Sequence, residues 1–231
     1  MGLRTKEKFV CGAKFNVGKQ RKIMDDSMTF NDIDDGLYPI PEIVRNGVAV
    51  DIGANGGTFT ARVSSFFSMI HSYEPIPLLA ERIRNRKLSN VVVYNEAVGD
   101  SEGTAKLIMH QNKDSGYTTT QRCIDKAICN HNEWTESAVS EEVPMVDLKT
   151  VINRIGGRID YLKMDCETSE YLILLNKDLQ NIRYIAIEVH CQMGKEHWNQ
   201  LKSWVEKTHK GFPDYSNDSN LECLLTPNSE A

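Results

Sequence analysis

The chain contains 231 residues, a length that predicts one domain with at most a small extension. Hydrophobic residues make up 40% and charged residues 26%, which excludes wholesale disorder and fibrous repeats. The formal net charge of -5 argues against general nucleic-acid binding, which needs a basic surface. No apolar run approaches about eighteen residues, so no membrane span is predicted, and the first residues lack the pattern of a secretory signal.

Six cysteines are expected to be mostly free thiols, which favours a cytoplasmic protein. They stand at positions 11, 123, 129, 166, 191 and 223, and no two of them form a Cys-x-x-Cys pair. The grouping of Cys123, Cys129 and His131 has a spacing that matches no common zinc pattern, so we expect no zinc site there.

Residues 1–46 are mixed and polar, and we interpret them as an N-terminal extension before a main domain at 47–231. The main domain begins with apolar runs at 48–53, 70–74 and 91–94, typical of buried strands. Helical spacing at 58–70 and 75–88 separates these runs. This alternation predicts a doubly wound α/β sheet.

The second half continues the alternation after an irregular stretch. Loose strand patterns at 104–110 and 143–146 flank residues 110–140, a polar segment interpreted as a variable loop or insertion. Asp147 is predicted to cap a helix that runs to Ile155. Further strands are predicted at 159–165, 182–189 and 221–225, and further helices at 168–179 and 195–207.

The first strand-to-helix turn, residues 51–58, has the sequence Asp-Ile-Gly-Ala-Asn-Gly-Gly-Thr. Asn55 and Thr58 replace glycines of the dinucleotide fingerprint, and no Gly-Lys-Ser/Thr of a phosphate loop follows. An acid closing the strand, flanking glycines and an acid ending the next strand suit S-adenosylmethionine, which has no phosphate. Glu74 is expected to accept the ribose hydroxyls, and Asp51 to lie below the amino-acid portion. The simpler alternative is an ordinary α/β turn with structural glycines.

Several segments around these residues resemble the FkbM-type methyltransferases, over roughly residues 48–195. They lie at 50–57, 73–75, 95–100, 146–152 and 159–167, and the match ends with Ile187-Glu188-Val189-His190. The resemblance implies a class I methyltransferase fold with a mostly parallel, seven-stranded sheet and helices on both faces. It also implies S-adenosylmethionine as methyl donor and hydroxyls of sugars or glycans as typical acceptors. The expected cofactor-binding residues are Asp51, Gly53, Asn55, Gly57, Thr58, Phe59, Glu74, Pro75, Glu96 and Ala97, the last two beside the adenine.

The sequence departs from the family pattern in two places. Thr168 stands where the family usually has glycine, and we expect it to cap the following helix. The segment 111–140 matches poorly, so the acceptor stays open. Tyr117 and Trp134 in that segment are interpreted either as sugar-stacking surfaces or as loop packing.

Asp165, Glu188 and His190 stand at the ends of the later predicted strands and are the predicted catalytic residues. His190 or Asp165 is expected to act as general base on the acceptor hydroxyl. Alternatively, all three hold a divalent cation, Mg²⁺ or Mn²⁺, that lowers the pKa of that hydroxyl. Glu167 is expected to favour the start of the next helix through its dipole, and Lys163 to be at most a salt-bridge partner.

Two other functions compete with O-methylation of a sugar or glycan. An N-methyltransferase is disfavoured because residues 165–168 contain no Asn-Pro-Pro-Tyr or Asp-Pro-Pro-Tyr sequence. A non-catalytic module with the methyltransferase fold is disfavoured because both the glycine turn and the strand-end acids are intact.

Overall fold

The structure is a computed structural model that describes residues 8–10, 13–15, 38–110, 118–121, 138–217 and 220–229. Within these ranges, nine strands form the main sheet. Eight lie in the order β2 (Ala13–Phe15), β1 (Lys8–Val10), β13 (Leu221–Pro227), β11 (Ile182–Val189), β10 (Ile159–Met164), β3 (Val48–Ile52), β4 (Met69–Tyr73) and β5 (Val91–Tyr94). The ninth, β12 (His209–Lys210), pairs with β13.

The central strands run parallel to one another, and the strands beyond β11 run in mixed directions. Strands β11, β10, β3, β4 and β5 are mutually parallel, whereas β13 is antiparallel to β11 and parallel to β1. The predicted α/β architecture with a mostly parallel sheet is therefore confirmed. The described part of the main sheet has nine strands rather than the seven expected: six are marked by apolar runs in the sequence, and β1, β2 and β12 are short strands without such a run.

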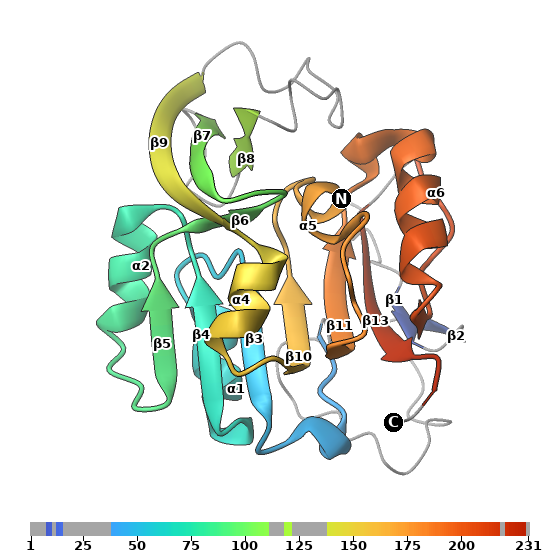
Figure 1. Cartoon of the computed structure of the whole chain (residues 1–231), viewed down its shortest axis with the longest axis horizontal. Coiled ribbons are helices and arrows are strands. Elements are labelled where there is room, and N and C mark those ends of the chain that lie inside the picture. The colour runs from blue at the N-terminus through green and yellow to red at the C-terminus, as the bar shows by residue number, and fades with distance from the viewer. Residues whose placement is uncertain are drawn as a thin grey trace, which may run out of the picture.

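Helices cover both faces of the main sheet (Figure 1). On one face, Val50 and Leu162 pack in a core with side chains of α4 (Leu148–Arg154), α5 (Glu170–Leu174) and α6 (Gly194–Val205). On the other face, Ala49 and Tyr161 pack with α1 (Thr58–Val63) and the 3-10 helix η2 (Glu42–Val44). Since successive strand residues point to opposite faces, a strand covered on both faces is mostly apolar on both.

Helix boundaries agree with prediction where a local signal exists. The Asp147 side chain accepts a 2.8 Å hydrogen bond from the Thr150 amide and caps α4, as predicted. Most other helices are shorter than predicted: α1 passes into the 3-10 helix η3 (Ser64–Phe66), and α2 spans Pro77–Arg84. The prediction that Thr168 caps a helix is wrong, because α5 begins at Glu170 with Ser169 in the N-cap position.

A second, smaller sheet lies over the carboxyl ends of the parallel strands (Figure 1). Its order is β6 (Ala97–Gly99), β9 (Ala138–Asp147), β7 (Gly103–His110) and β8 (Thr118–Thr120). Leu107 and Met145 of this sheet pack against Leu79 of α2 in a separate core. The strands predicted at 104–110 and 143–146 are thus confirmed, but they belong to this sheet. Tyr117, Trp134, Cys123, Cys129 and His131 lie outside the described residues.

Part of the predicted extension packs into the main domain. Ile40 and Val44 are buried beside α1, and the Tyr161 hydroxyl donates a 3.2 Å hydrogen bond to the Pro39 carbonyl. Strand β1 pairs in parallel with β13 at the edge of the main sheet. None of the helices described combines the length and apolar character needed to cross a membrane.

Candidate functional site

A pocket of about 770 Å³ opens at the carboxyl ends of β3, β4 and β10, and residues of the small sheet also line it. Ligand sites of open α/β sheets occupy this position. Most of the predicted cofactor residues line it: Gly53, Asn55, Thr58, Phe59, Glu74, Pro75, Glu96 and Ala97. The other two, Asp51 and Gly57, are buried behind the lining.

The glycine turn after β3 needs glycine at two positions. Gly53 has φ +75°, and a Cβ there would lie 2.0 Å from the Asp165 carbonyl oxygen. Gly57 has φ +74°, and its Cβ would lie 2.8 Å from Cγ1 of Ile83. Asn55 also has positive φ, 50°, a conformation that asparagine tolerates better than most residues. The turn therefore brings its backbone against the end of β10.

Asp51 is fully buried in a polar network under this turn. Its Oδ2 accepts a 2.6 Å hydrogen bond from the Thr60 hydroxyl, which lies 2.8 Å from the Ser72 hydroxyl. Its Oδ1 lies 3.3 Å from the Lys163 ammonium, so the predicted salt-bridge possibility for Lys163 is confirmed. Burial alone would lower the pKa of Lys163, but the charges of Asp51 and then Asp165 raise it above its ordinary value. Lys163 is therefore a fixed cation.

Glu74 is a buried carboxylate held in one orientation at the pocket wall. Its two oxygens each accept a 2.8 Å hydrogen bond, one from the Asn55 amide and one from the Ile76 amide. The Asn95 side chain donates to the carbonyls of Glu74 and Pro75 at 3.0 and 2.8 Å, which fixes the loop. Burial, the largest influence, raises the pKa of Glu74 to about 7. The carboxylate keeps unused lone pairs that can accept from a ligand.

Glu96 lines the same pocket on the side of the small sheet. Its carboxylate is paired through two hydrogen bonds with Arg154, the last residue of α4. The Arg154 guanidinium also lies 5.0 Å from the centre of the Tyr94 ring, and Tyr94 stacks on Tyr73 at 4.5 Å. Arg154 has no motif of its own and was not predicted.

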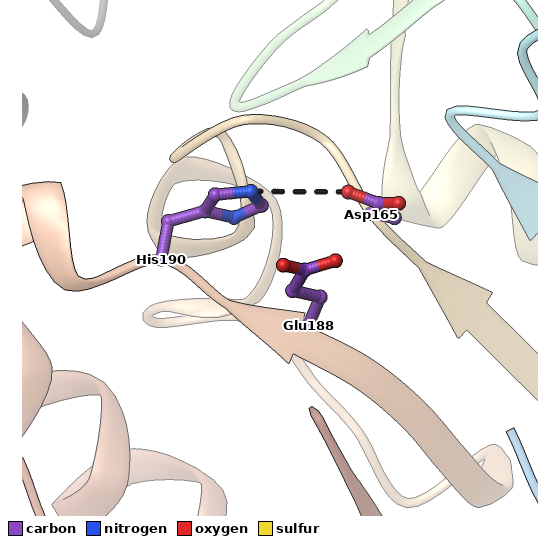
Figure 2. Close-up of side chains that lie close together, drawn as sticks. All are labelled: Asp165, Glu188 and His190. Carbon is purple, nitrogen blue, oxygen red and sulfur yellow. Dashed lines mark ion pairs between the residues drawn. The ribbon is translucent and has the colours of Figure 1, made fainter. Parts of the chain in front are cut away.

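The three predicted catalytic side chains converge next to the pocket (Figure 2). One ligand atom from each of Asp165, Glu188 and His190 lies within 4.8 Å of the others. Asp165 follows β10 and lines the pocket, whereas Glu188 and His190 come from the end of β11 and lie beside Asp165. Nε2 of His190 lies 3.8 Å from Oδ1 of Asp165. Asn220 donates a 3.1 Å hydrogen bond to Glu188.

Two further carboxylates hold the buried His190 ring. Nδ1 lies 3.1 Å from Glu170, and Nε2 lies 3.3 Å from Glu167. Burial alone would lower the pKa of His190, but Glu170 and then Glu167 raise it well above its ordinary value. The contact of Glu167 with His190 was not predicted, and it comes with left-handed backbone at both Glu167 and Thr168.

Sequence reasoning missed Glu170 and Tyr38. Glu170 is fully buried and also accepts a 2.7 Å hydrogen bond from the Cys166 amide, but in the sequence it reads as an ordinary first-turn acid. Tyr38 lines the pocket from the predicted extension, with its ring packed edge-on against Phe59 at 5.7 Å.

Burial raises the pKa of Cys166 well above its ordinary value, which fits an unreactive free thiol.

The comparison with protein families agrees with the resemblance in the sequence. Residues 51–212 match the methyltransferase FkbM domain family. A solved structure of methyltransferase FkbM from Methylobacillus flagellatus KT is similar over 77% of this chain and 42% of that chain, with 15% identity and a TM-score of 0.45. The chain therefore spans less than half the length of that protein. No curated protein matches. The chain belongs to the methyltransferase FkbM domain family.

Proposed function

We propose that the protein transfers a methyl group from S-adenosylmethionine to a hydroxyl of a sugar or glycan. One observation carries the proposal: the Gly53 turn and the oriented Glu74 carboxylate face the same pocket as Asp165. The turn and Glu74 suit a nucleoside without phosphate, and Asp165 stands where a second substrate can meet it. Membership in a methyltransferase family supports the same reaction type.

On the donor side, Glu74 would accept hydrogen bonds from the ribose hydroxyls through its unused lone pairs. Its two amide donors, from Asn55 and Ile76, keep the carboxylate in place before the ligand arrives. Glu96 and Ala97 line the far side and would border the adenine. The sulfonium would then face the carboxylate-rich end of β10.

On the acceptor side, Asp165 would act as the general base. Methyl transfer is an in-line displacement, so the enzyme must align the hydroxyl with the methyl carbon and remove its proton. The Asp165 side chain is 33% exposed, lines the pocket and borders Glu188 and His190 (Figure 2). His190 contacts three carboxylates and would hold Asp165 and Glu167 in position.

A divalent cation on Asp165, Glu188 and His190 is the second form of this proposal. The ligand atoms are close enough, within 4.8 Å, and two carboxylates with an imidazole suit Mg²⁺ or Mn²⁺. The fit is incomplete, because Nε2 of His190 also lies 3.3 Å from Glu167. When bound, such a cation would lower the pKa of the acceptor hydroxyl.

The test begins with calorimetry of S-adenosylmethionine binding, where no heat at millimolar donor would end the proposal. Transfer of labelled methyl to a panel of nucleotide sugars and oligosaccharides, with and without chelator, then identifies the acceptor. Turnover that survives chelation contradicts the cation form.

Two variants separate catalysis from mere binding. Asp165→Asn and Glu188→Gln are expected to bind the donor normally while turnover falls by about 10²-fold or more. Asp214→Asn, whose side chain is 97% exposed, is the matched control and should keep full turnover. Equal turnover in all three variants would contradict the assignment of Asp165 and Glu188. A wild-type protein that binds the donor but transfers no methyl to any hydroxyl or amine would favour a binding module.

A further inference from the structure

Lys163 is a buried cation at the floor of the pocket. Its side chain is 6% exposed, yet it belongs to the pocket lining together with Gly53 and Asp165. The other lysines and arginines among the described lining residues are Arg62, Arg82 and Arg86, and all three are exposed at the rim. Among the described lining residues, Lys163 is therefore the cation with which a negatively charged group deep in the pocket can pair.

The Lys163 ammonium has donor capacity left. It donates to the Gly53 carbonyl at 3.1 Å and lies 3.3 Å from Asp51, which accounts for two of its three N–H groups. The described residues supply no further hydrogen-bond acceptor for the third. Aromatic rings limit where the ammonium can move, since the ring centres of Tyr38 and Phe59 lie 5.5 and 5.9 Å from Nζ.

The proposed donor carries one group that fits this cation. S-adenosylmethionine has a sulfonium, an ammonium and a carboxylate, and the first two suit acids such as Glu74 and Asp165. The carboxylate would be repelled by those same acids. Because Lys163 already occupies the Gly53 carbonyl, the ligand ammonium would meet a like charge there. The amino-acid portion must therefore present its carboxylate, not its ammonium, to Lys163.

We infer that Lys163 binds the carboxylate of the methyl donor and so sets the orientation of its amino-acid portion. The inference rests on the proposed function, because it takes S-adenosylmethionine as the ligand. It gives Lys163 a second task beyond its ion pair with Asp51. The ammonium that donates to the Gly53 carbonyl would also bind the ligand carboxylate beside the Gly53 turn.

Ligand and protein are changed together in the test. Dissociation constants are measured by calorimetry for S-adenosylmethionine and for its decarboxylated analogue, with wild-type protein and with Lys163→Met. The ratio of the two constants cancels any general loss of affinity in the variant. A charge-assisted hydrogen bond predicts that the ratio shifts toward the decarboxylated analogue by about 10- to 100-fold in Lys163→Met. Lys195→Met, at an exposed position of α6, is the matched control and should leave the ratio at the wild-type value.

A structural role alone gives a different result. If Lys163 only positions Asp51 and Gly53, the dissociation constants of both ligands rise by the same factor in Lys163→Met. The ratio of the two constants then stays unchanged, which overturns the inference. If Lys163→Met does not fold because Asp51 is left unpaired, the same ratio is measured in Asp51→Asn against Asp51→Asn with Lys163→Met. Failure of the wild-type protein to bind either ligand would refute the proposed donor itself.

Discussion

Alanine at Gly53 is expected to cost more stability than alanine at any other position of the glycine turn. An alanine Cβ would lie 2.0 Å from the Asp165 carbonyl oxygen, against about 3.3 Å for even a close carbon–oxygen contact. That oxygen belongs to the backbone at the end of β10, so it cannot rotate away as a side chain can. The left-handed φ of +75° adds about 1–2 kcal/mol of strain to an overpacking cost of about 1–3 kcal/mol. Gly53→Ala should therefore lower the free energy of unfolding by about 2–5 kcal/mol.

The same turn supplies two matched controls. Gly57 has nearly the same φ, +74°, but its Cβ would meet the buried Ile83 side chain, with Cγ1 at 2.8 Å, rather than a backbone atom. Gly57→Ala is expected to cost the backbone strain of about 1–2 kcal/mol and the displacement of Ile83, which together stay below the cost of Gly53→Ala. Gly56 has nothing within 4 Å of the added Cβ and no positive φ, so Gly56→Ala should stay within about 0.5 kcal/mol of wild type.

Urea unfolding of the three variants, extrapolated to water, measures these differences directly. The expected order of stability is Gly56→Ala, then Gly57→Ala, then Gly53→Ala. Donor binding and turnover of folded Gly53→Ala, measured in the cold, should also fall because Asp165 is displaced. A free energy of unfolding for Gly53→Ala equal to that of Gly56→Ala would refute the claim that the turn packs against β10 at this distance.

Three further predictions concern single contacts. The pKa of Glu74 is about 7 in the folded protein against 4.5 ordinarily, so its contribution to stability is present below about pH 4.5 and is lost as pH rises through about 7. Urea titrations at about pH 5 and about pH 8 should show this loss in wild type and not in Glu74→Gln, while donor affinity in wild type rises over the same range. Asp147→Ala removes the α4 cap and should cost about 1 kcal/mol of unfolding free energy, whereas exposed Lys149→Ala in the same helix should not. Lys163→Met leaves Asp51 buried without its cation and should lower the free energy of unfolding by about 3–5 kcal/mol. Adding Asp51→Asn should restore most of this free energy, and a double variant as unstable as Lys163→Met would contradict the ion pair.

The sequence predicts best what depends on neighbouring residues. Strands β3, β10 and β11 are covered on both faces, so each appears in the sequence as a mostly apolar run. The parallel direction of these strands then brings Asp165 and Glu188 to one edge of the sheet, where the structure has them side by side. The Asp147 cap is equally local, since donor and acceptor lie in the same turn.

Features that depend on distant residues or on unusual backbone were not predictable in this way. The pairing of β1 with β13 joins opposite ends of the chain, and its short strands carry no distinct pattern. The contact of Glu167 with His190 requires positive φ at both Glu167 and Thr168, residue types that seldom adopt it. Tyr38 reaches the pocket only because the segment from Pro39 onward packs beside α1.

The charges around the pocket affect the release of the product in the proposed reaction. Asp165 and Glu74 face the pocket, Glu188 lies beside Asp165, and the buried cation Lys163 is paired with Asp51. Such surroundings attract a ligand with a sulfonium, and the attraction is strongest in a partly buried site where water screens it little. Transfer of the methyl group removes the sulfonium charge, so the product loses that attraction. Its carboxylate is still repelled by the acidic side chains. The same charges that attract the donor would therefore favour release of the product. S-adenosylmethionine should bind more tightly than S-adenosylhomocysteine. The ratio of their dissociation constants should come closer to one in Asp165→Asn.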